Sequence, residues 1–273
     1  LPVPSGPAIA KVLKDPRVVN LSFTGSTEIG RVLLKEAADR VIRTSMELGG
    51  NAPFLVLADA NVDDAVSGAM LAKMRNGGAA CTAANRFYVS KKVAAQFTEK
   101  LTAAMAEIKM ASGLTEGAQL GASVSVKERN KIADLVTASI SQGAELKLGG
   151  KTPDGDGAFY PPTVLTVAAD NEILKEEIFG PVAVIVTVDS DEQAIALAND
   201  TEYGLISYIY SADLGRALKV AEAMESGMVA INRGVISDPA APFGGYKQSG
   251  LGREGGFDGV HEFLEKKYIG AAF

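Results

Sequence analysis

From residue 17 onward the chain alternates short apolar runs with longer amphipathic segments. Runs of about four to eight β-branched and apolar residues predict strands, whereas apolar residues spaced three and four apart predict helices. A repeated order of strand, then helix, is typical of a parallel sheet covered by helices. The pattern therefore predicts an α/β protein.

The same pattern gives the expected bounds of the elements. Strands are predicted at 17–23, 41–47, 54–57, 86–89, 145–148, 162–167, 182–188, 206–210 and 228–232, and helices at 28–40, 62–75, 93–108, 127–141, 192–199 and 214–224. Residues 182–188 are continuously apolar, which indicates a strand buried on both faces. Residues 262–269 alternate, which predicts an edge strand near the C-terminus. Asp59 is expected to cap the helix that begins near Val62.

Composition narrows the class of protein. The 273 residues carry 27 Lys and Arg against 33 Asp and Glu, a net charge of −6, which excludes a protein that binds nucleic acid electrostatically. A hydrophobic fraction of 47% excludes a disordered chain. The length favours one large or two modest domains. The first residues, Leu1 with Pro2 and Pro4, suggest the interior of a longer chain, so we expect a fragment.

Cys81 is the only cysteine, so the chain forms no intrachain disulfide and no multi-cysteine zinc site. This cysteine usage favours a reducing, cytoplasmic location. No apolar run approaches the roughly 18 residues that span a bilayer, so neither a membrane nor a secretory segment is expected.

The surroundings of Cys81 suit a nucleophile. It follows a loop of small residues, 76–80, in which a substrate has access to the thiol. A buried, inert cysteine remains the other interpretation of the same residues. His261 is the only histidine and lies near the far end of the chain, so the base that assists a nucleophile is expected to be a carboxylate or water.

Glu47 is the first candidate base. It ends a predicted strand just before Gly49 and Gly50, and open α/β sheets bind ligands at the ends of their strands. A general base at this place needs a pKa raised by partial burial. A glutamate facing water at the strand end fits the sequence equally well.

Two further segments offer polar groups at element ends. Gly25 and Ser26 join a strand to a helix, where free N–H groups bind phosphate, or where Ser26 simply caps the helix. No GxGxxG is present, so a dinucleotide-binding fingerprint is not claimed. In EEIFGP at 176–181, adjacent carboxylates are compatible with ribose binding, metal binding or solvent exposure, and spacing alone does not decide.

Five motifs in one order resemble the NAD(P)-dependent aldehyde dehydrogenase superfamily. They are FTGST at 23–27, ELGG at 47–50, the single Cys81, EEIFGP at 176–181 and PFGGYKQSGLGRE at 242–254. The resemblance implies an aldehyde-dehydrogenase-like catalytic domain with a parallel sheet and flanking helices at 51–250. It also implies a remnant of the Rossmann-like cofactor domain at 1–50 and a tail with an oligomerisation strand at 251–273. Much of the cofactor domain is expected to be missing, so the isolated chain is expected to be inactive.

The resemblance also assigns roles to residues. Cys81 matches the nucleophile, whose backbone N–H forms half of an oxyanion hole, and Glu47 matches the base. NAD or NADP is the implied cofactor. Its implied contacts are Gly25 and Ser26 for the pyrophosphate, Glu177 for the nicotinamide ribose, Phe179 for the ring, and Leu48.

Within the superfamily the chain is most similar to succinate-semialdehyde dehydrogenases, which implies a role in 4-aminobutyrate degradation. The likeness lies in ELGGNAPF at 47–54, in Arg75 six residues before Cys81, and in APFGGYKQSGLGREGG at 241–256. A guanidinium binds a carboxylate through two parallel hydrogen bonds, which suits a substrate with a carboxylate at its far end. Capping of the preceding helix is the other interpretation of Arg75. Ser237 and Phe243 match further substrate contacts.

Two departures from the superfamily concern the cysteine loop. Many members have Gly-Gln-x-Cys where this chain has Gly78-Ala79-Ala80-Cys81, and Ala83 excludes the disulfide switch of some members. The expected partners are a small aldehyde and further copies of the chain, as a homodimer or homotetramer, without nucleic acid, membrane or metal. Two alternatives stay open: a dehydrogenase for uncharged aldehydes, and a non-catalytic assembly module formed by the isolated chain.

Overall fold

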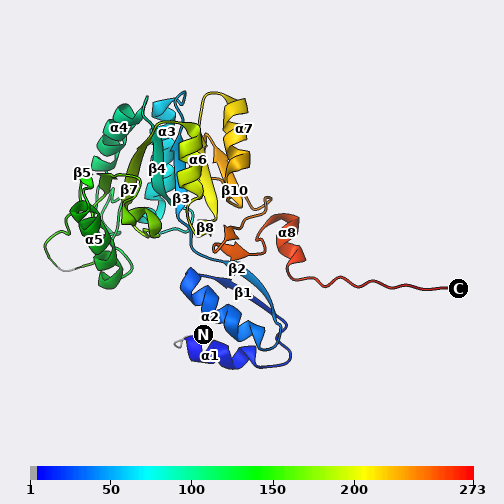
Figure 1. Ribbon diagram of the computed structural model, residues 1–273. Helices are drawn as coiled ribbons and strands as arrows, with labels where there is room; N and C mark the ends of the chain where they lie inside the picture. The colour runs from blue at the N-terminus through cyan, green and yellow to red at the C-terminus, as the bar shows by residue number, and fades with distance from the viewer. Residues whose placement is uncertain (1–4, 156) are drawn as a thin grey trace. The chain divides into compact units, whose positions relative to one another are not determined.

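The chain forms two compact units in a computed structural model that describes residues 5–155 and 157–273 (Figure 1). One unit combines residues 1–49 with 237–273, and the other is residues 50–236. The sequence-based division placed 237–250 with the central segment. In the structure these residues belong with the first 49, because β12 (Gly250–Leu251) pairs antiparallel with β2 (Arg43–Glu47).

The smaller unit is built on β2. This strand lies between β1 (Asn20–Thr24), its parallel neighbour, and β12. Its other elements are α1 (Ser5–Leu13), α2 (Thr27–Ala38), β11 (Tyr246–Lys247) and α8 (Gly256–His261). Buried Leu13, Ala37 and Ile42 form a small apolar core in this unit.

The larger unit contains a seven-stranded sheet in the order β10-β9-β3-β4-β7-β6-β5. The strands are β3 (Ala52–Val56), β4 (Ala84–Ser90), β5 (Glu145–Leu148), β6 (Thr163–Thr166), β7 (Val182–Val188), β9 (Ile206–Tyr210) and β10 (Met228–Ile231), and a short β8 (Tyr203–Gly204) precedes β9. Neighbouring strands are parallel, except that the edge strand β5 runs antiparallel to β6. The predicted α/β class with a largely parallel sheet is confirmed.

Helices cover both faces of this sheet. They are α3 (Val62–Met74), α4 (Ala94–Ala106), α5 (Val126–Ser141), α6 (Asp191–Asn199) and α7 (Leu214–Ala223), with short 3-10 helices η1 (Arg75–Gly78) and η2 (Glu172–Lys175). Side chains on a strand alternate between faces. On one face Phe54 packs against Phe87 and Tyr208, with ring centroids 5.1 and 5.7 Å apart, and against Phe97 of α4. The strand residues that alternate with these aromatic residues point to the other face of the sheet, where they form an apolar core with α5, α6 and α7.

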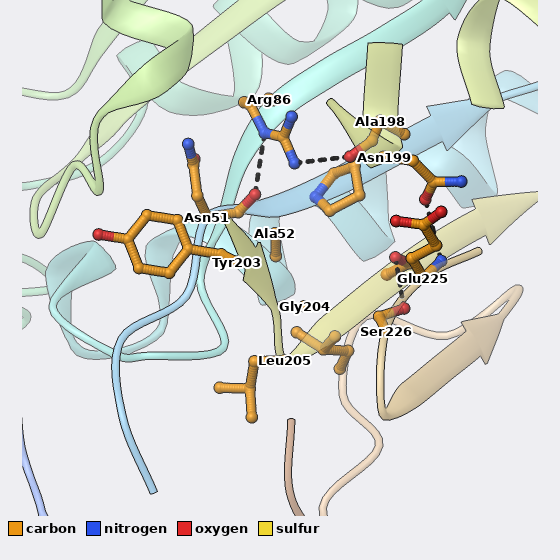
Figure 2. A pocket seen from close by; sticks show the side chains of 13 residues that line it. Asn51, Ala52, Arg86, Ala198, Asn199, Tyr203, Gly204, Leu205, Glu225 and Ser226 are labelled. Carbon is orange, nitrogen blue, oxygen red and sulfur yellow. Dashed lines mark hydrogen bonds between the residues drawn. The ribbon is translucent and has the colours of Figure 1, made fainter. Parts of the chain in front are cut away.

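Arg86, on β4, is a buried cation held almost entirely by carbonyl groups (Figure 2). Its Nε donates to the Asn51 carbonyl at 2.9 Å, and its terminal nitrogens donate to the carbonyls of Leu197 and Ala198 at 3.2 and 3.0 Å. These last two carbonyls lie at the C-terminal end of α6, where the helix dipole favours positive charge. The cavity beside them measures about 10 Å³, enough for about one water molecule.

The structure corrects two sequence-based expectations. The strand predicted at 262–269 is absent. These residues lie outside any helix or strand and are largely exposed. A strand needs a neighbour for its backbone groups, whereas in this chain Arg43 binds the carbonyls of Glu262 and Leu264 with its side chain. Asp59 does not cap α3. Asn61 does, while Asp59 binds Ser211 and Arg216.

The other predicted strands and helices are present, with ends shifted by up to three residues. Among the described residues, no helix combines the length and apolar character that crossing a membrane requires.

Candidate active site

Cys81 lies in the loop between α3 and β4, directly before the strand. Helix α3 ends at Met74, and the loop turns through Asn76, Gly77 and Gly78, all with positive φ. A side chain at Gly78 would overlap the carbonyl oxygen of Gly180, so this turn requires glycine. Cys81 in this loop has intermediate exposure, and its role as a nucleophile stays a prediction.

Two side chains fasten the residue after the cysteine. Arg75 donates to the Thr82 hydroxyl at 3.1 Å, and the Tyr208 hydroxyl donates to the Thr82 carbonyl at 2.8 Å. Burial raises the pKa of Tyr208, so this phenol stays protonated as a donor. Arg75 is exposed and is the C-cap residue of α3, while its side chain binds across the loop to Thr82.

The chain also packs closely behind Cys81 at Gly50. A Cβ on Gly50 would overlap the Cys81 carbonyl oxygen, so only glycine allows this approach. The Gly50 N–H donates to Glu177 Oε1 at 3.0 Å. Burial raises the pKa of Glu177, while the Gly50 hydrogen bond and the charges of Lys131 and Lys73 oppose this effect. Glu177 is thus fastened next to the backbone that supports the cysteine loop.

A cavity of about 540 Å³ borders the same loop. Its walls include Asn76 and Ala79 of the loop, residues 119–124, and Phe179 with Gly180 and Pro181. The Phe179 side chain is 44% exposed, which leaves an aromatic ring available for a planar ligand.

In the smaller unit, Glu47 ends β2 and is only 4% exposed. Neither carboxylate oxygen has a hydrogen-bond partner among the described residues. The pKa of Glu47 is raised to about 8, mainly by burial and also by the charge of Glu254, while the charge of Arg253 opposes this effect. A carboxyl group with a pKa in this range can accept and release a proton near neutral pH, which is the property of a general base.

The three predicted cofactor residues of this unit lie around the same strand end. The Gly25 N–H donates to the Glu47 carbonyl at 3.0 Å, and the Leu48 N–H donates to the Ser249 carbonyl at 2.9 Å. Ser26 is the N-cap of α2 and accepts a hydrogen bond from Ile29 N–H at 3.4 Å. The capping interpretation of Ser26 is confirmed, and phosphate binding at this turn stays a prediction.

The predicted substrate residues of the smaller unit occupy different settings. Phe243 exchanges two backbone hydrogen bonds with Glu254, each 2.7 Å long. Glu254 is the residue whose charge raises the pKa of Glu47. Ser237 is exposed. The predicted site residues thus divide between the units. Cys81, Arg75, Glu177 and Phe179 belong to the larger one, and Glu47, Leu48, Gly25, Ser26, Ser237 and Phe243 to the smaller one.

Sequence reasoning gave no role to Glu254, Tyr208 and Lys73. Glu254 is the last residue of the motif at 242–254, so the sequence could have marked it as a candidate. Its charge raises the pKa of Glu47. Tyr208 is part of an apolar strand, and Lys73 occupies the last turn of a helix, where lysines are usually solvated. Their roles depend on tertiary contacts, which the local sequence does not show.

The model of the aldehyde dehydrogenase family matches residues 3–269. The chain belongs to this family.

Individual relatives agree with that assignment. The chain is 53% identical over 269 residues to a succinate-semialdehyde dehydrogenase from Paenarthrobacter nicotinovorans, covering 98% of this chain and 59% of that protein. It is 48% identical to a glutarate-semialdehyde dehydrogenase from Pseudomonas putida, covering 92% and 52%. The solved structure of an Escherichia coli NADP-dependent enzyme superposes with a TM-score of 0.93 at 45% identity, covering 95% and 54%. The chain therefore spans about half the length of the aldehyde dehydrogenases it matches.

Residues 5–155 and 157–273 contain no group of three His, Cys, Asp or Glu side chains that could hold a metal ion. The carboxylates at 176 and 177 accordingly belong to no such cluster.

Proposed function

We propose that this chain supplies the catalytic part of an NAD(P)-dependent dehydrogenase for aldehydes with a carboxylate at the far end, with succinate semialdehyde as the first candidate substrate. The observation that carries the proposal is the position of Arg75. Its guanidinium is exposed, is fixed to Thr82, and stands beside the residue that follows the candidate nucleophile. A fixed guanidinium near a reactive thiol suits a substrate with an aldehyde at one end and a carboxylate at the other.

The residues of the larger unit fit a nicotinamide cofactor. Phe179 exposes an aromatic face, and Glu177 keeps acceptor positions beyond the one that binds Gly50. Glu177 would hold the ribose hydroxyls and Phe179 the ring, while Gly25, Ser26 and Leu48 are the proposed contacts in the smaller unit. The oxidised nicotinamide, when bound, supplies the acceptor for a hydride.

The proposed chemistry takes place on the Cys81 sulfur. The thiolate attacks the aldehyde carbon and forms a C–S bond, which gives a thiohemiacetal with negative charge on the former carbonyl oxygen. When the C–H bond of that carbon breaks and hydride departs, the C=O double bond forms again and leaves a thioester on Cys81. Cys81 therefore has to be deprotonated and accessible at the start of the cycle.

Glu47 completes the proposed cycle as general base. It takes a proton from water, whose oxygen attacks the thioester carbon, and the C–S bond breaks to return the Cys81 thiolate and release the carboxylic acid. Because its pKa is about 8, the Glu47 carboxyl group can hold this proton near neutral pH. Ser237 and Phe243 are the proposed further contacts of the substrate.

The test is an activity assay with succinate semialdehyde, glutarate semialdehyde and an uncharged aldehyde of similar length, each with NAD⁺ and NADP⁺. The chain is assayed alone, where we expect no turnover, and after co-expression with the part of the Paenarthrobacter nicotinovorans relative that lies outside the match. In the co-expressed sample we expect Cys81→Ala to abolish turnover. Normal turnover in that variant would refute the role of Cys81.

Arg75→Ala separates the proposed substrate class from its alternative. We expect kcat/KM for the two semialdehydes to fall about 100-fold, while the uncharged aldehyde is affected less than about threefold, because one charge-assisted contact is lost. An equal fall for all three aldehydes would assign Arg75 to loop structure and would favour a dehydrogenase for uncharged aldehydes. Lys100→Ala, a surface change on α4, is the matched control.

A further inference from the structure

Lys73 is a lysine with no solvent exposure, in the last turn of α3. Its ammonium donates to the Asn85 side-chain oxygen at 2.7 Å. Lysine is almost never fully buried unless its charge is paired, because removing an ammonium group from water is costly. Stability alone favours an apolar side chain at this position, so the burial of Lys73 calls for another explanation.

The place of the two partners in the sequence supplies one. Lys73 precedes Cys81 by eight residues, and Asn85 follows it by four, as the second residue of β4. The hydrogen bond between them therefore joins the end of α3 to the start of β4. It closes the base of the loop that carries Cys81, on the side buried in the protein.

The backbone of Lys73 takes part in the same arrangement. A Cβ on Gly78 would lie 3.2 Å from the Lys73 carbonyl oxygen, so the turn of the loop packs directly on this residue. Arg75 and Tyr208 fasten the loop at Thr82, close to the thiol. Lys73 and Asn85 fasten it at its two ends.

The charge of Lys73 acts on a second group beside the loop. It lowers the pKa of Glu177, and Glu177 in turn favours the charged form of Lys73. Lys131 and the Gly50 N–H are the other groups that favour the Glu177 carboxylate. Burial opposes the charge on Lys73 and lowers its pKa to about 7.

We infer that Lys73 is a positioning residue that holds the Cys81 loop closed through Asn85. It touches neither the substrate nor the thiol in this proposal. The proposal concerns the order of the loop and is independent of the substrate.

The first experiment is hydrogen exchange on the purified chain, comparing the wild type with Lys73→Met. We expect the amides of Ala79 and Ala83, which form hydrogen bonds within the loop, to exchange about tenfold faster, with the amides of β7 and β9 unchanged. Lys100→Met, at a surface ion pair of α4, is the matched control and should change neither set. Unchanged loop exchange in Lys73→Met, or an equal increase throughout the unit, would overturn the proposal.

A double variant keeps the test valid if Lys73→Met folds poorly. Lys73→Met with Asn85→Leu replaces both polar partners with apolar groups of similar size, which commonly restores stability. We expect its Tm to return toward that of the wild type while loop exchange stays fast. Recovery of loop protection together with Tm would show that Lys73 acts by packing alone. Lys73→Gln keeps a donor without the charge, and we expect it to retain most of the loop protection.

Discussion

Two buried charged residues, Arg86 in the larger unit and Glu47 in the smaller one, have opposite surroundings. Arg86 is 2% exposed and donates to three carbonyls and to the Tyr88 hydroxyl. Glu47 is 4% exposed, and its two carboxylate oxygens have no hydrogen-bond partner among the described residues. The two side chains are equally buried, so burial alone does not distinguish their roles.

The difference lies in how each charge is compensated. Hydrogen bonds from Arg86 connect β4 to the residue before β3 and to the end of α6, so the cation links elements of the fold. Within the part of the chain that the structure describes, the Glu47 carboxylate forms no hydrogen bond, and its pKa is raised to about 8. A buried polar group with all its partners contributes to structure, whereas one left without partners costs stability and is retained for another reason. Arg86 therefore contributes to the fold, whereas the surroundings of Glu47 suit the general base that we propose it to be.

The largest expected effect is on stability, from Arg86→Met. The change leaves the buried carbonyls of Asn51 and Ala198 without the donor that Arg86 supplies, and leaves the Leu197 carbonyl with the Tyr88 hydroxyl alone. We expect the free energy of unfolding to fall by about 3 kcal/mol. Urea denaturation measures it. Arg216→Met is the matched control, since Arg216 is an arginine of intermediate exposure that pairs with Asp59 and Asp191, and its loss should cost about 1 kcal/mol. Equal effects would contradict the structural role of Arg86.

An intermediate effect is expected from the pH dependence of stability around Glu47. Its pKa is about 8 in the folded chain and near the ordinary 4.5 in the unfolded chain, so the folded state binds an extra proton between these values. The resulting stabilisation is complete below about pH 4.5 and is lost as the pH rises through 8.

Glu47→Gln removes this titration. We expect the wild type to lose about 2 kcal/mol relative to Glu47→Gln between pH 6.5 and pH 8.5, measured by urea denaturation at several pH values. Parallel stability curves for the two proteins would show that Glu47 titrates at an ordinary pKa. They would remove the contrast with Arg86.

The smallest expected effect concerns the hydroxyl of Tyr88. It donates to the Leu197 carbonyl at 3.1 Å and accepts from Arg86 at 3.2 Å. Tyr88→Phe should cost about 1 kcal/mol, because Leu197 keeps its bond to Arg86. Thermal denaturation measures the change, and Tyr268→Phe, at a residue that is 93% exposed, should leave Tm unchanged. A loss as large as that of Arg86→Met would mean that the hydroxyl, and not the guanidinium, organises this cluster.

Local sequence predicted most of the elements because each carries its own pattern. The apolar run at 182–188 and the amphipathic segment at 127–141 are found almost where they were expected, as β7 and α5. The strand expected at 262–269 is absent, because alternation shows a preference for extended backbone but supplies no neighbouring strand. Asp59 and Asn61 are both good capping residues, and tertiary contacts with Ser211 and Arg216 decided which of them caps α3.

The sequence by itself determined the α/β class, the family, and the residues that are candidates for the chemistry: Cys81, Glu47 and Arg75. These follow from local periodicity and from motifs that stand as short continuous stretches of chain. The tertiary structure alone decided the environment of each charge. It left the Glu47 carboxylate without a hydrogen bond to any residue of 5–155 and 157–273, satisfied Arg86 with carbonyls, fixed Arg75 to Thr82, and buried Lys73 against Asn85. Burial, pKa and hydrogen bonding depend on residues distant in the sequence, and only folding brings those residues together.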